Sequence, residues 1–240
     1  MGATLVSAVT AGRRRPAAAY SGDMLWAENL LLVLTDRRTG RLVVPWNMAD
    51  LALAGSVLGQ LWRSGRIDVD APDRPRRPGR IRVLDDRPTG DDVLDRVLAA
   101  LDGADRRPVA AIHRIKTGIR PALYQRLEDR GVVSHRVGRV LVFLPIDEWP
   151  ARTPDATEPF EERLGHWWTS APYREATDDM ECASATALLS AIGAITPVAR
   201  RMGLAGRVRM IQRLAAQVRE SSWVATTVNR IRTAQQATTA

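Results

Sequence analysis

LLLVLTDRRTGRLVVPWNMADLALAGSVLGQLWRSGRIDVD, residues 30–70, is the stretch that decides the fold. Its leucine-rich start predicts a helix from about Asp23 to Leu34, because apolar residues recur there at helical spacing. Gly40 then turns the chain into a short extended piece at 42–44. A longer helix follows Pro45 and runs to about Arg63, and its alanines, glycines and serines permit close packing against other helices. The alternating GRIDVD that ends the stretch predicts a short strand.

The rest of the chain predicts a mainly α-helical protein. Further helices are expected at 91–101, 109–116, 121–130, 160–168, 174–195, 204–219 and 221–233. A second strand is expected at 81–86, and a β-hairpin at 132–145 with a basic tip at 134–139 and an apolar second arm, followed by a linker to about residue 159. We therefore expect a flexible N-terminal tail at 1–22, a loop at 71–80, and a single helical domain at 23–240 with short strands and a protruding β-hairpin.

The positive charge of the chain is unevenly spread. The formal net charge is +8, and residues 197–240 alone contain eight arginines and one acidic residue, whereas residues 145–196 are strongly acidic. Basic blocks of this kind favour anionic partners such as lipid headgroups or nucleic acid, although a solvated basic face would give the same composition. Lys116 is the only lysine among 35 basic residues, an arginine bias that is typical of a GC-rich bacterial genome.

The sequence offers little for catalysis. The three histidines show no metal-ligand spacing, and no nucleophile elbow, HExxH or phosphate-loop pattern is present. The single Cys182 excludes an internal disulfide, and no window reaches the roughly 20 apolar residues that span a bilayer. We therefore expect a cytoplasmic protein without enzyme activity, cofactor or metal, whose contact with any membrane is peripheral.

Two segments could hold an anion. The segment 113–120 places Arg114, Lys116 and Arg120 across a helix break, where unpaired backbone N–H groups of the next helix would help to cradle a phosphate. Trp46 stands at the start of a helix, where an indole could wall a headgroup site or rest at a membrane interface. Both features also have an ordinary structural interpretation: segment 113–120 as a solvated basic helix end, and Trp46 as a core side chain.

The hypothesis that the protein binds DNA competes with the hypothesis that it binds lipid. The helices at 109–116 and 121–130, followed by Gly131 and a hairpin, resemble a winged-helix module. Glu128 and Asp129 offset Arg126 and Arg130 on the presumed recognition helix, which makes it a poor face for a major groove. Nucleic acid is accordingly the second of the two partners considered.

The order of segments resembles the Golgi phosphoprotein 3 family over roughly residues 24–233. The resemblance is carried by residues 30–70, by Asp86–Leu101 with its Asp-x-Pro-Thr-Gly start, and by the spacing of His113, Arg120, Leu127, Gly131 and Val132 before the hairpin. It implies a mostly helical single domain with a protruding hairpin. It also implies binding to phosphatidylinositol 4-phosphate through a tryptophan and several arginines, and an adaptor role toward membrane enzymes.

Carried over by position, the resemblance assigns the lipid site to named residues. Trp46 matches the family's lipid-site tryptophan, and Arg120 matches one of its arginines. Two other family arginines fall on Thr117 and at about Ala54. Lys116, next to Thr117, is a substitute cation, and Arg114 and Arg41 are further cations. Val140, Leu141 and Val142 match hairpin residues that enter the bilayer. The resemblance thus implies an anionic membrane as partner and a membrane-enzyme client, while the missing arginines leave the headgroup open. The apolar arm of the hairpin also allows self-association by pairing with another copy of the chain.

Overall fold

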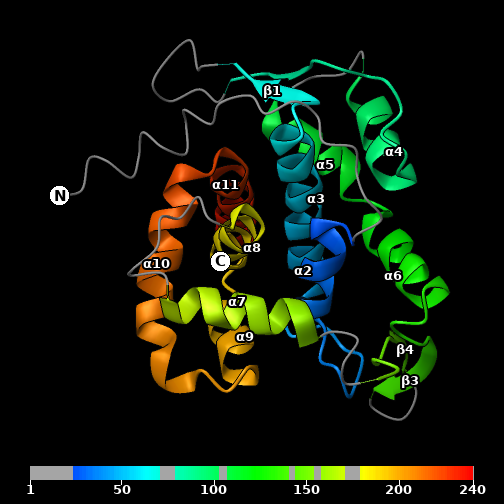
Figure 1. Ribbon diagram of the computed structural model, residues 1–240, viewed down its shortest axis with the longest axis vertical. Helices are drawn as coiled ribbons and strands as arrows, with labels where there is room; N and C mark the ends of the chain where they lie inside the picture. The colour runs from blue at the N-terminus through cyan, green and yellow to red at the C-terminus, as the bar shows by residue number, and fades with distance from the viewer. Residues whose placement is uncertain are drawn as a thin grey trace.

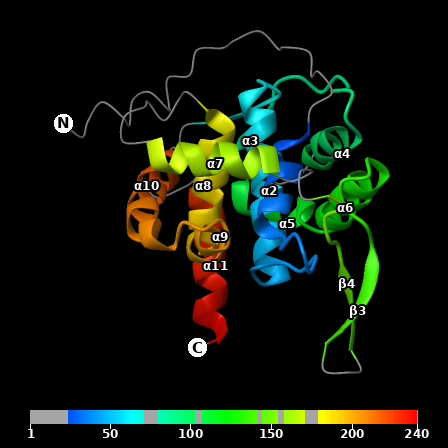
Figure 2. The same cartoon turned by 60° about the horizontal axis from the view of Figure 1, so that its bottom comes forward.

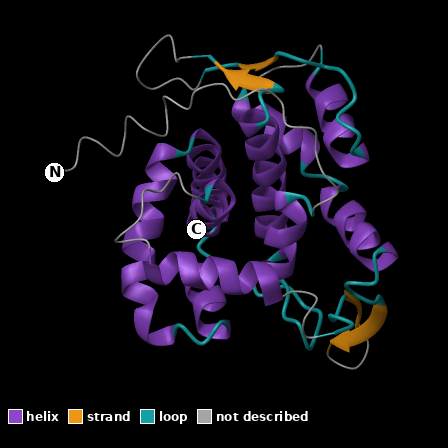
Figure 3. Ribbon diagram, viewed as in Figure 1, coloured by secondary structure: helices purple, strands orange, loops and turns teal. Residues whose placement is uncertain are grey.

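The computed structural model describes residues 24–70, 79–102, 107–140, 144–153, 158–170 and 179–239. Within these ranges ten α-helices and two two-stranded antiparallel sheets form a mainly helical structure, which confirms the predicted fold class (Figures 1 and 3). The helices are α2 (Trp26–Leu34), α3 (Trp46–Arg63), α4 (Asp92–Leu101), α5 (Pro108–Ile115), α6 (Ile119–Asp129), α7 (Glu158–Ser170), α8 (Met180–Ala191), α9 (Ile195–Arg201), α10 (Val208–Ser221) and α11 (Trp223–Thr239). The strands are β1 (Ile67–Val69), β2 (Ile81–Val83), β3 (Arg136–Val140) and β4 (Leu144–Glu148), and a short 3₁₀ turn, η3 (Ala205–Arg207), precedes α10.

Helix α3 is the centre of the molecule. Every residue from Leu51 to Leu61 is buried, because α2, α8 and α11 pack on one part of its circumference and α5 and α6 on another (Figure 1). A helix that is apolar all round is suited to such a position. Both ends of α3 leave the core: the first turn presents Trp46 to solvent, and Arg63 is exposed in the last turn.

The small side chains of α3 permit the close packing that the sequence predicts. A Cβ atom added to Gly55 would lie 2.8 Å from a methyl group of Leu188 on α8 and 3.0 Å from one of Val224 on α11. At Gly59 the nearest atom to an added Cβ would be the hydroxyl oxygen of Ser184, at 3.4 Å. Glycine at 55 therefore lets two helices approach α3 at the same level.

Three buried glutamates tie separate segments together, and each binds two arginines. Glu28 of α2 lies 3.2 Å from Nε of Arg126 and 3.3 Å from Nη1 of Arg130, both on α6. Glu148 and Glu161 are bound in the same manner by the pairs Arg41 and Arg136, and Arg37 and Arg201. Since a buried carboxylate without a partner costs several kcal/mol, these residues act as structural clamps.

The predicted hairpin exists, but its strands are not where the sequence placed them. Residues 136–139, expected at the basic tip, form strand β3 together with Val140, and most of β4 at 144–148 lies in the segment expected to be a linker. Glu148 explains the register. Its carboxylate lies across β3 where a Cβ on Gly138 would come within 2.3 Å, and it accepts a hydrogen bond from Nε of Arg136 at 2.7 Å. Arg136 therefore lies within β3, where its guanidinium binds the carboxylate of Glu148.

Other boundaries also differ from those predicted. The helix expected at 174–195 ends at Ala191, because Gly193 adopts a φ of +76°, and a separate helix, α9, follows. The extended piece at 42–44 amounts to one isolated bridge between Thr35 and Leu42. Helix α6 begins at Ile119, two residues before the expected Pro121. The predicted tail at 1–22 and most of the loop at 71–80 lie outside the described residues.

The buried thiol of Cys182 gives a test of this core. Burial, together with the charge of Asp179, raises the pKa of the Cys182 thiol to about 12. The unfolded thiol ionises near its ordinary value of 9.0, so stability is present below that pH and falls as pH rises from there toward 12. We predict that iodoacetamide at about pH 8.5 labels Cys182 in the denatured protein but not in the native protein. Mass spectrometry of the labelled protein would check this. Rapid labelling of the native protein would contradict the buried position.

Candidate lipid-binding site

The first turn of α3 presents an exposed indole. Trp46 is the first residue of the helix and 65% of it is exposed, so it is not the core side chain of the ordinary reading. Pro45 precedes it in an extended conformation that starts the helix. Asp50 and Ala54 follow on the same side of α3, at successive intervals of four residues.

The junction of α5 and α6 forms the second part of the site. Gly118 stands between the two helices with a φ of +84°, which only glycine adopts without strain, so the helix break predicted from the sequence is confirmed. No side chain caps the start of α6. Arg114 and Thr117 are exposed here, and Lys116 is half-buried beside them. The junction therefore offers cations and an uncapped helix start.

An ion pair joins the two parts. Nε of Arg120 donates a hydrogen bond of 2.8 Å to Oδ1 of Asp50, and both side chains are mostly buried, with exposed fractions of 25% and 13%. Arg120 thereby binds a residue that follows Trp46 by one turn of α3. Sequence reasoning missed Asp50, although its spacing of four residues from Trp46 was a usable signal.

The local electrostatics fit a cationic site that Asp50 partly neutralises. Partial burial and the neighbouring charge of Lys116 lower the pKa of His113, which favours its neutral form at pH 7. An anion bound at the junction would oppose this effect and raise the pKa of His113. Arg120 already has a carboxylate partner, so an incoming phosphate must share its guanidinium or displace Asp50.

The two positions that lack the family's arginines differ in the structure. Ala54 is fully buried in the core, whereas Thr117 is exposed at the helix junction. An arginine at 54 would have to enter space already filled by the packing around α3. An arginine at 117 could extend into solvent beside Lys116.

The hairpin projects from the helical body and forms the third candidate surface (Figure 2). Val140 ends β3, paired with Leu144, while Leu141 and Val142 lie outside the described residues. Val137 is 65% exposed on β3, an apolar residue that sequence reasoning did not single out. At its base, the ring of Trp149 stacks on Tyr124 of α6 with a centroid distance of 4.8 Å, which holds the hairpin to the core.

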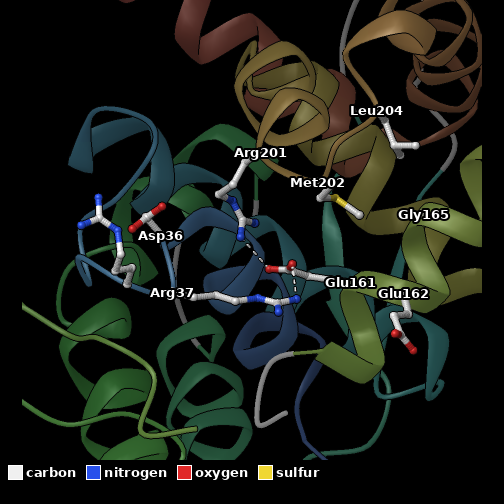
Figure 4. Close-up of a pocket in the computed structure, with 9 residues that line it drawn as sticks. Asp36, Arg37, Glu161, Glu162, Gly165, Arg201, Met202 and Leu204 are labelled. Atoms are coloured by element: carbon white, nitrogen blue, oxygen red, sulfur yellow. Dashed lines mark hydrogen bonds and ion pairs between the residues drawn. The ribbon is translucent and has the colours of Figure 1, made fainter. Parts of the chain in front are cut away.

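A polar cavity of about 410 Å³ lies elsewhere, where the turn at 36–38 meets α7 and the end of α9 (Figure 4). Glu161 occupies its centre and accepts a hydrogen bond of 2.8 Å from Nη1 of Arg201, with Arg37 on its other oxygen. Asp36, Arg38 and Glu162 also line the cavity. Its charges balance one another, so it gives no preference for an anion over a cation.

The described residues show neither a metal site nor a straight membrane-spanning helix. Among the described residues no group of three or more histidine, cysteine, aspartate or glutamate side chains is arranged to hold a metal ion. In the same residues no single helix has the length and apolar character to cross a membrane, and α8 with α9 meets those criteria only as a pair bent by 120°.

Sequence comparison settles the family. The sequence model of the Golgi phosphoprotein 3 (GPP34) family matches residues 26–235, which is nearly the whole chain. The chain belongs to the Golgi phosphoprotein 3 family. No curated protein matches it significantly. The positions that the sequence analysis assigned to a lipid site lie in the structure as follows: Trp46 on α3, Arg120 on α6, and Arg114, Lys116 and Thr117 at the α5–α6 junction.

The difference between positions 54 and 117 can be measured by stability. We predict that Ala54→Arg lowers the free energy of unfolding by about 3 kcal/mol or more, because it forces a long charged side chain into a packed core. Thr117→Arg should change it by less than about 0.5 kcal/mol, as is usual for an exposed position. Chemical denaturation followed by circular dichroism checks both, and equal effects of the two substitutions would refute the assigned burial.

Proposed function

We propose that this Golgi phosphoprotein 3 family member is a cytoplasmic, peripheral membrane protein that binds an anionic phospholipid headgroup, similar to phosphatidylinositol 4-phosphate, as a non-catalytic adaptor. The observation that carries the proposal is the exposed Trp46 one helical turn from the Arg120–Asp50 pair. An indole with an apolar body and a polar N–H suits the headgroup level of a bilayer. Family membership supports the same class of function at a coarser level.

The cations of the site would supply the charge complementarity. A hydrogen bond from a charged donor to phosphate contributes about 1.5–3 kcal/mol, and a cation near an anionic surface about 1 kcal/mol. Arg120, Lys116 and Arg114 together give a moderate affinity by this reasoning. The hairpin would add apolar contact through the exposed Val137, and through Val140, Leu141 and Val142 as the family resemblance implies.

The competing DNA-binding reading is weakened by the partners of α6. Arg126 lies 2.8 Å from Asp91 and also contacts Glu28, while Nη1 of Arg130 lies 3.3 Å from the same buried glutamate. Burial lowers the pKa of Arg126, but these carboxylates outweigh it and the net shift is upward, so the cation is strongly held. A helix whose cations are bound internally offers few donors to a major groove.

The remaining partners follow from the adaptor role. A membrane-enzyme client and self-association through the hairpin are part of the proposal. Within the described residues the hairpin sheet has two strands, so each strand has an edge along which a second copy could pair.

Vesicle sedimentation tests the headgroup site. We predict that Trp46→Ala combined with Arg120→Gln lowers the partition coefficient on vesicles containing phosphatidylinositol 4-phosphate about tenfold or more, because it removes the indole and the central cation. Arg63→Gln removes the same charge from the opposite end of α3 and should leave binding within about twofold. Equal binding by the double variant and the wild type would contradict the assignment of the headgroup site to Trp46 and Arg120.

Asp50 gives a gain-of-binding prediction. Asp50→Asn keeps an oxygen acceptor for Nε of Arg120 but removes a negative charge from the site, so affinity for anionic vesicles should rise about fivefold. The rise should be larger for phosphatidylinositol 4-phosphate than for a singly charged lipid at equal total vesicle charge, because the phosphomonoester carries more charge. A loss of affinity would show instead that Asp50 acts mainly by positioning Arg120.

A further inference from the structure

The corner where α9 meets α10 carries a second cationic surface. Arg200 is at the end of α9, Arg207 ends η3, and Arg209 and Arg213 lie in the first two turns of α10; all four are exposed. A hydrogen bond of 3.0 Å from Nε2 of Gln212 to the hydroxyl of Thr196 joins α10 to the first turn of α9, and only a short turn through η3 separates the end of α9 from the start of α10. Arg200 is therefore brought beside the start of α10. We call these four arginines the α9–α10 surface.

This surface differs from the arginine-rich regions already described. Arginines such as Arg126, Arg136 and Arg201 are bound to buried glutamates. The four arginines of the α9–α10 surface have no acidic partner within the part of the chain that the structure describes. Their charge is therefore available to a partner, unlike most of the positive charge of α6 and the hairpin base.

The arrangement is unfavourable for the isolated protein. Arg209 and Arg213 are four residues apart on one helix face, where like charges repel. The first turn of α10 contains no acidic residue, so Arg207 and Arg209 stand at the positive end of the helix dipole without compensation. A bound anionic surface would relieve both repulsions.

An exposed apolar side chain completes the surface. Met210 follows Arg209 at the margin of the exposed face of α10 and is 36% exposed, while the helix packs on α8 through its buried side. Arginines with an exposed apolar residue on an amphipathic helix are typical of segments that lie on a bilayer. Figure 1 shows the start of α10 and the hairpin at the same, lower end of the view, on opposite sides.

We propose that the α9–α10 surface is a second membrane contact that binds anionic lipid headgroups without headgroup specificity. It rests on the proposed peripheral membrane function and goes beyond the site at Trp46. The contact would hold the protein on any anionic bilayer, while the Trp46 site selects a headgroup. Nucleic acid is the outcome that the test must separate from it.

The test compares full-length variants on vesicles of equal parts phosphatidylcholine and phosphatidylglycerol at physiological salt. Arg209→Gln/Arg213→Gln should lower the partition coefficient about tenfold, and Arg209→Lys/Arg213→Lys should retain it, because the charge is kept. The control Arg82→Gln/Arg87→Gln removes two exposed arginines from the region of β2 and should stay within about twofold of wild type. Thermal unfolding verifies that all variants are folded.

The outcomes separate this inference from the proposed headgroup site. If Arg209→Gln/Arg213→Gln binds vesicles like the control, the inference is overturned. It is also overturned if that variant loses binding to duplex DNA or single-stranded RNA while its vesicle binding is unchanged. If Trp46→Ala/Arg120→Gln keeps full binding on vesicles that also contain phosphatidylinositol 4-phosphate, while the α10 variant loses binding to phosphatidylglycerol vesicles, the headgroup site fails and the α9–α10 contact stands. If the wild type binds no anionic vesicle, both fail.

Discussion

The burial of α3 on all sides is the constraint on which the rest of the structure depends. From Leu51 to Leu61 the helix has no solvent face, so its neighbours must approach closely around it. Gly55 makes this possible for α8 and α11, because a Cβ atom at this position would lie only 2.8 Å from Leu188 and 3.0 Å from Val224. Because the helix cannot shift within such a core, its first turn is held rigidly at the surface. Trp46 and Asp50 owe their positions to this constraint.

The pairing of arginines with buried glutamates divides the positive charge of the protein into two classes. Glu28, Glu148 and Glu161 each hold two arginines from other segments, and these arginines serve the fold. The Arg41 and Arg136 guanidiniums hold the pKa of the Glu148 carboxyl below its usual range, so the clamp at the hairpin base stays charged. Net charge therefore overstates the charge that is available for binding.

Two groups of exposed or half-buried cations lie on the surfaces proposed to bind a partner. Lys116 and Arg114 lie at the α5–α6 junction near the Arg120–Asp50 pair, and four arginines lie at the α9–α10 corner. Asp50 stands between the two classes, since it binds Arg120 as the glutamates bind their arginines but does so at the edge of the proposed site. In the function we propose, a partly neutralised headgroup site beside non-specific cationic contacts would give the moderate affinity that reversible attachment to a membrane needs.

The sequence by itself determined the mainly helical class, the order of the segments, the long helix after Pro45 and the helix stop at Gly118. These features follow from local periodicity and from backbone conformations that only glycine adopts easily, so they can be read over a few residues. Only the tertiary structure decided the hairpin register, the burial of Ala54 and the pairing of Arg120 with Asp50, which lie 70 residues apart. A side chain's partner depends on which distant segments packing brings together, and local patterns contain no such information.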